Sequence, residues 1–90
     1  MSVRVVVTPT FERAVKKLHA RDRKVLDEAV REILAAPDAG VAKKGDLAGV
    51  YVHKFKLNKQ EILLAYQFSA STVELLSIGA HENFYRDLKR

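Results

Sequence analysis

Three apolar stretches in the second half of the chain decide the fold: YVHKFKL at residues 51–57, EILLAYQF at 61–68 and TVELLSI at 72–78. In the first stretch Tyr51, His53 and Phe55 alternate with residues that include Lys54 and Lys56, as in a strand with one buried face. The short segments Asn-Lys-Gln and Ser-Ala-Ser separate the stretches and favour turns. We therefore predict an antiparallel meander of three strands, at residues 50–57, 61–68 and 72–78.

The first half of the chain predicts one strand and two helices. Valines alternate through residues 2–8, which indicates a strand. Thr8 and Pro9 supply the hydroxyl cap and early proline of a helix start, and we expect Asp22 to cap a second helix after a break at residues 19–21. The apolar positions that repeat at helical spacing are Phe11, Ala14, Val15 and Leu18 in the first helix and Val25, Leu26, Ala29, Val30, Ile33 and Leu34 in the second.

These elements predict a single α+β domain over residues 1–90, in the order β-α-α-β-β-β, with the helical hairpin packed on one face of the sheet. Residues 41–49 read as a polar connection, and residues 81–89 as a short C-terminal helical segment. The opposite sheet face is then expected to be open. It would carry Lys54 and Lys56, with His81 and Tyr85 at its edge.

Composition narrows the class of protein. Apolar residues make up 48% of the chain and charged residues 30%, which excludes a disordered chain. The absence of cysteine excludes disulfides and fits a reducing compartment, and no stretch has the length of a signal peptide or membrane span. We expect a cytoplasmic protein that does not enter a membrane. The net charge of +5 favours an anionic partner, although a solubility role explains it equally well.

Neither a metal nor a cofactor is expected. The three histidines, at positions 19, 53 and 81, lack the spacing of metal ligands, and no compact acidic cluster accompanies them. The chain also lacks a glycine-rich phosphate loop.

The order of elements, with KGDLAGVYVHKFKL at 44–57, LLAYQ at 63–67 and IGAHENFYR at 78–86, resembles the RelE/ParE toxin superfamily over nearly the whole chain. The resemblance implies a toxin of a type II toxin–antitoxin pair, neutralised by a cognate antitoxin that wraps around it. The RelE-like branch cuts mRNA in the ribosomal A site without a metal, the YafQ-like branch is a histidine-using ribonuclease, and the ParE-like branch poisons DNA gyrase.

The resemblance also implies functional positions. The two strand lysines of the family correspond to Lys54 and Lys56, and its C-terminal pair of cation and tyrosine corresponds to His81 and Tyr85. One position departs from the pattern, because Leu63 stands where RelE has a catalytic arginine. Lys59 and Arg86 are the nearest replacements for that cation, and the apolar stretch with a late histidine makes the chain lean toward the YafQ-like branch.

These residues match the needs of RNA cleavage without a metal. The 2′-hydroxyl attacks the adjacent phosphorus, so the site needs a base, an acid and cations around the phosphorane. Histidine suits proton transfer near neutral pH, and lysines stabilise the developing charge. We assign His81 the acid or base role, Tyr85 base stacking or proton transfer, and phosphate binding to Lys54 and Lys56. Lys59 and Arg86 complete the predicted RNA-binding set.

Each assignment has a structural alternative. His81 could cap the last strand, Tyr85 could anchor the tail, and the two strand lysines could be solvated surface positions. His53 alternates with aromatic residues and reads as a half-buried core histidine. We assign no role to His19, and Glu82 is a candidate for orienting His81 only if the geometry allows it.

Three functions remain open from the sequence. The first is a metal-independent endoribonuclease, an mRNA interferase that inhibits translation on the ribosome. The second is a non-enzymatic gyrase inhibitor, which the leucine at position 63 favours. The third is a degenerate binding module, retained for its antitoxin or as a transcriptional co-repressor together with it. In each case we expect an acidic, amphipathic antitoxin segment that folds on the basic surface.

Overall fold

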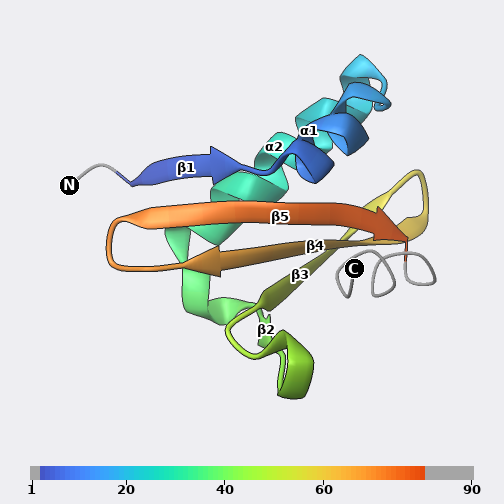
Figure 1. Ribbon diagram of the computed structural model, residues 1–90. Coiled ribbons are helices and arrows are strands. Elements are labelled where there is room, and N and C mark those ends of the chain that lie inside the picture. Colours follow the sequence, from blue (N-terminus) through green and yellow to red (C-terminus); the bar gives the residue numbers. More distant parts are fainter. Residues whose placement is uncertain (1–2, 81–90) are drawn as a thin grey trace.

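The computed structural model describes residues 3–80 and confirms the predicted α+β class. Five strands form one sheet in the order β1-β5-β4-β3-β2, and both helices lie on one side of it (Figure 1). The elements are β1 (Arg4–Val7), α1 (Pro9–Lys16), α2 (Ala20–Ala35), η1 (Pro37–Ala39), β2 (Val41–Ala42), η2 (Gly45–Leu47), β3 (Tyr51–Leu57), β4 (Gln60–Phe68) and β5 (Thr72–Ala80).

The meander of β3, β4 and β5 is antiparallel, as predicted, whereas β1 pairs with β5 in parallel. The sheet is therefore mixed. Its parallel pair joins residues 4–7 to residues 72–75 at opposite ends of the chain. The predicted C-terminal helical segment at 81–89 lies outside the described residues.

The start of α1 confirms the predicted cap. The Phe11 amide donates to Thr8 Oγ1 at 3.1 Å, and Pro9 occupies the first turn, where its missing N–H costs nothing. Thr8 Oγ1 also donates to the Leu76 carbonyl at 2.6 Å, which fastens the helix start to β5.

The predicted cap of the second helix is wrong. Helix α2 begins at Ala20 with His19 as N-cap residue, so Asp22 lies inside the first turn. Asp22 is only 5% exposed, and its two carboxylate oxygens accept from Asn58 Nδ2, each at 3.4 Å. A buried carboxylate needs such a partner, so packing against the β3–β4 hairpin replaces the capping role.

The predicted polar connection at 41–49 also contains more structure than expected. It includes β2, which pairs with β3, and the 3₁₀ turn η2. At the other end of β3, Asn58 and Lys59 form a two-residue hairpin turn with φ of 52° and 68°. Positive φ at both positions is the geometry that matches the twist of two antiparallel strands.

The main core lies between the helices and the sheet. Its buried members are Phe11, Leu26, Ile33, Leu64, Tyr66, Val73 and Leu75. Tyr51 and Phe55 of β3 pack against this cluster, so the predicted inward face of that strand is confirmed.

The opposite sheet face is less open than predicted. A second buried cluster lies on it, formed by Val50, Val52, Leu63 and Ala65 with Leu47 and Leu76 packed against them. The apolar run of β4 supplies side chains to both faces, as in strands buried on two sides, and η2 brings Leu47 to the cluster. Exposed polar residues therefore flank an apolar centre.

Candidate functional site

Strand β3 places Lys54 and Lys56 on the sheet face that turns away from the helices. Both lysines are exposed, while Phe55 between them packs against the core. Lys54 lies opposite Leu63 of β4 and Lys56 lies opposite Glu61. The expected position of this pair on the exposed face is therefore confirmed. Two ammonium groups on one exposed face can bind a phosphate, and this role stays a prediction.

Leu63 gives the site an apolar side. Its exposed fraction is 0%, and it belongs to the second buried cluster. The position where the family resemblance expects a catalytic arginine is thus part of a core, and no cation can take its place without disrupting that core.

The chain brings Lys59 to the tip of the β3–β4 hairpin, three residues after Lys56. Asn58 ties this tip to α2 through Asp22. Lys59 is therefore an exposed cation at the end of the sheet where β3 and β4 turn.

Only part of the predicted site can be compared with the structure. His81, Tyr85, Arg86 and Glu82 lie outside the described residues. The last described pair of β5 and β4 is Ala80 with Ile62, and His81 follows Ala80 in the sequence. Of the predicted site residues, the structure places Lys54, Lys56 and Lys59 on or next to β3.

The other two histidines lie apart from this face. His53 is half-buried on the helix side, as predicted, with Nε2 3.2 Å from Glu32 Oε2 and its ring stacked on Phe55. The approach to Glu32 is an ion-pair distance without hydrogen-bond geometry, and Glu32 is 70% exposed, so this contact contributes little. His19 is the exposed N-cap residue of α2 and makes no side-chain capping bond.

Tyr66 anchors the segment between α2 and β2 to the core. Its hydroxyl donates to the Pro37 carbonyl at 2.5 Å, and its ring stacks with Tyr51 at 5.8 Å. Burial raises the pKa of Tyr66 above the ordinary value of 10.0, a backbone hydrogen bond from Gly40 opposes this, and the charges of Tyr51 and Asp38 add to the rise. The phenol is therefore a neutral structural donor at physiological pH.

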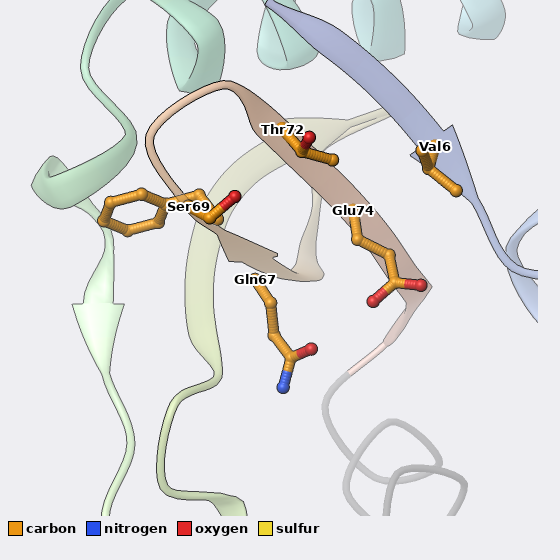
Figure 2. A pocket seen from close by; sticks show the side chains of 6 residues that line it. Val6, Gln67, Ser69, Thr72 and Glu74 are labelled. Atoms are coloured by element: carbon orange, nitrogen blue, oxygen red, sulfur yellow. The ribbon is translucent and has the colours of Figure 1, made fainter.

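Sequence reasoning missed a hollow at the far end of the lysine-bearing face. It has a volume of about 320 Å³ and is lined by Val6, Gln67, Phe68, Ser69, Thr72 and Glu74 (Figure 2). The pairing register of three neighbouring strands brings its residues together, because Val6 of β1 pairs with Glu74 of β5 and Glu74 pairs with Gln67 of β4. The sequence offers one sign of this hollow, the polar residues Gln67 and Glu74 within apolar strands. Their proximity depends on the pairing of β4 with β5, which cannot be read from the sequence.

Within residues 3–80, no group of three or more histidine, aspartate or glutamate side chains is arranged to hold a metal ion. Over the same range, no helix has the length and apolar character needed to cross a membrane.

Solved structures of bacterial toxins share this fold. The Escherichia coli RelBE toxin–antitoxin complex contains a chain that is 23% identical, with a TM-score of 0.71, covering 90% of this chain and 99% of that one. The RelBE2 complex of Mycobacterium tuberculosis gives 22% identity and a TM-score of 0.72, covering 90% and 100%. The YoeB/ParE toxin of Agrobacterium tumefaciens gives 19% and 0.67, covering 88% and 99%.

No curated protein sequence matches the chain. A family model does, and its description is the ParE-like toxin of type II bacterial toxin–antitoxin systems. The match extends over residues 5–89 and so includes every described strand and helix except the first residue of β1. The chain therefore belongs to the ParE-like toxin family of type II bacterial toxin–antitoxin systems.

Proposed function

We propose that this toxin is a metal-independent endoribonuclease that cleaves mRNA on the ribosome and so inhibits translation in the cytoplasm. The observation that carries the proposal is the pair of exposed lysines, Lys54 and Lys56, on one face of β3. The net charge of +5 supports an anionic substrate. The RelE fold of the similar structures agrees with this activity, although fold alone does not decide function.

In the proposed reaction the RNA supplies its own nucleophile. Lys54 and Lys56 hold the scissile phosphate and stabilise charge on its non-bridging oxygens as the 2′-oxygen bonds to phosphorus and the bond from phosphorus to the leaving 5′-oxygen breaks. His81 transfers a proton to or from the reacting oxygens, and Tyr85 stacks on a base or assists that transfer. Lys59 and Arg86 bind flanking phosphates, which makes affinity fall with salt.

The experiment is inducible expression of the wild type, His81→Ala and Lys54→Ala in bacteria, followed by primer extension on a translated message. We expect in-frame cuts with the wild type and a loss of at least tenfold in cutting with each variant, since general acid–base catalysis contributes roughly 10²–10⁴-fold. Lys24→Ala is the matched control, because Lys24 is an exposed lysine on α2, away from this face. Uncut mRNA with the wild type, or undiminished cutting by both variants, would refute the proposal.

A second candidate is a non-enzymatic toxin that inhibits DNA gyrase. The observation that favours it is at position 63, where a fully buried leucine stands in place of the catalytic cation expected for the RelE-like branch. A gyrase cleavage-complex assay on the same cells separates the two functions. Trapped gyrase–DNA complexes together with intact mRNA would select the gyrase candidate.

We also propose that a cognate antitoxin neutralises this protein, as the family of type II toxin–antitoxin systems suggests. The positive charge favours an acidic antitoxin segment, whose binding would weaken as salt rises. An antitoxin complex whose affinity did not change with salt would contradict the electrostatic part.

A further inference from the structure

The hollow at the far end of the lysine-bearing face is built by three neighbouring strands. Val6 of β1, Glu74 of β5 and Gln67 of β4 form one row across the sheet, and Thr72 and Ser69 flank it at the β4–β5 turn. Figure 2 shows the side chains of Gln67 and Glu74 extending in the same direction from adjacent strands. The hollow therefore has an apolar wall, an amide and a carboxylate.

The polar groups of this hollow are available to a ligand. Within residues 3–80, the side-chain carboxylate of Glu74 and the side-chain amide of Gln67 form no hydrogen bond or ion pair with other protein groups. Asp22 and Tyr66, by contrast, are both satisfied by protein partners. Glu74 is half-buried and Gln67 is exposed, so a ligand in the hollow can reach both polar groups.

The chemistry of the hollow excludes a second phosphate site, since the carboxylate would repel a phosphate. It suits a ligand that presents two adjacent donors next to an acceptor. Among the RNA bases only guanine does so: N1–H and the N2 amino group match the two oxygens of a carboxylate, and O6 accepts from an amide NH₂ such as that of Gln67. Adenine, cytosine and uracil each present at least one acceptor where a carboxylate needs a donor.

We propose that this hollow binds a guanine base of the single-stranded RNA whose phosphate lies on Lys54 and Lys56, an inference that rests on the proposed ribonuclease function. Glu74 accepts from N1–H and N2, Gln67 donates to O6, and Val6 contacts the base. The volume of about 320 Å³ is at the lower end of the range for small-ligand sites, roughly 300–1,000 Å³, which fits a single base.

The distance between the two parts of the surface is suited to one RNA strand. Lys54 lies opposite Leu63, and Gln67 follows four residues later in β4, a separation of about 13 Å at the rise of an extended strand. An RNA of a few nucleotides can therefore contact both parts. Between them, the half-buried side chains of Leu47 and Leu76, which pack on the buried apolar cluster, offer contact to the intervening bases.

Fluorescence anisotropy with short RNA probes tests this proposal. The probe is a 2′-O-methyl pentanucleotide, which cannot be cleaved because it lacks the nucleophile, with either guanine or hypoxanthine at a single position. Hypoxanthine lacks only the N2 amino group. We expect the wild type to bind the guanine probe roughly tenfold more tightly at one position of the probe, the effect of one hydrogen bond to a charged group.

Glu74→Gln should reduce that ratio to near one, because a neutral amide cannot accept both donors. The ratio is the decisive measurement, since the lost negative charge also raises affinity for any RNA. Glu28→Gln, an equal charge change on the exposed side of α2, should retain the wild-type ratio. Circular dichroism of each variant checks that the fold is intact.

The outcomes distinguish this inference from the function it rests on. RNA binding and mRNA cleavage with equal affinity for both probes at every position, or with a ratio that survives Glu74→Gln, would overturn the guanine site alone. A wild type that binds neither probe and leaves mRNA intact would overturn the ribonuclease function as well.

Discussion

Replacing Gly40 by alanine should destabilise the protein through one side chain, that of Tyr66. Gly40 has φ of −69° and ψ of 167°, a conformation open to any residue, so the backbone itself does not require glycine. A Cβ built there would overlap Tyr66 Oη and lie 3.1 and 3.2 Å from Cζ and Cε1 of the ring. Glycine is needed because the phenol passes directly over the chain.

The expected magnitude follows from two costs and one gain. The phenol would have to move, which weakens its 2.5 Å hydrogen bond to Pro37, and a lost hydrogen bond costs about 0.5–1.5 kcal/mol. Overpacking a ring that is only 1% exposed adds about 1–3 kcal/mol. Alanine returns about 0.4–1 kcal/mol by restricting the unfolded chain. We expect Gly40→Ala to lower the free energy of unfolding by about 2 kcal/mol.

Urea unfolding followed by circular dichroism measures this cost, and the Tyr66→Phe background isolates its cause. Phenylalanine lacks the overlapping oxygen, so Gly40→Ala in that background should cost less than about 1 kcal/mol, and the two substitutions should couple. Gly79→Ala is the control, because among the described residues no atom lies within 4 Å of its Cβ. A cost below about 0.5 kcal/mol, or an equal cost in both backgrounds, would refute the reasoning.

Three further predictions use the same unfolding assay. The raised pKa of Tyr66 means that the folded state favours the neutral phenol, so its contribution to the free energy of unfolding is complete below pH 10, the unfolded pKa, and is lost as pH rises through the folded pKa. The wild type should therefore lose stability above pH 10 relative to Tyr66→Phe, and parallel pH profiles of the two proteins would contradict this. Lys59→Gly should stabilise by roughly 0.5–1 kcal/mol, because φ of 68° is strained for lysine; a lower urea midpoint would argue against that strain. Asn58→Asp should destabilise by about 1–3 kcal/mol by facing the buried carboxylate of Asp22, whereas Asn58→Gly retains the turn and should cost less.

Local patterns in the sequence predicted the local structure well. Alternation located β3 and its two faces, and the threonine–proline pair located the start of α1, because both signals act within a few residues. Asp22 was misassigned because a capping residue and a buried partner of a distant turn look alike in sequence. The parallel pairing of β1 with β5 has no local signal at all, since it joins chain ends through the packing of the helices between them.

The candidate site was predictable to the extent that it depends on a single strand. Lys54 and Lys56 were located by alternation, but their surroundings depend on other elements. Leu47 reaches this face through a 3₁₀ turn that the sequence suggested only as a polar connection, so the face was expected to be open. The apolar run of β4 could have predicted that this face is covered, because a strand that is apolar at successive positions buries both of its faces.

A single irregularity in β5 determines which residues share the lysine-bearing face. Strict alternation would place Glu74 on the face opposite to Ser77, because the two residues are three positions apart. The register shifts between Ala65 and Tyr66 of β4, whose partners are Ser77 and Leu75, so one residue of β5 is extra at this point. The extra residue turns the first part of β5 over, so Glu74 lies on the same face as the lysines and Leu75 enters the core. The proposed guanine site and the proposed phosphate site can serve one RNA only because this bulge brings Glu74 onto the surface that carries Lys54 and Lys56.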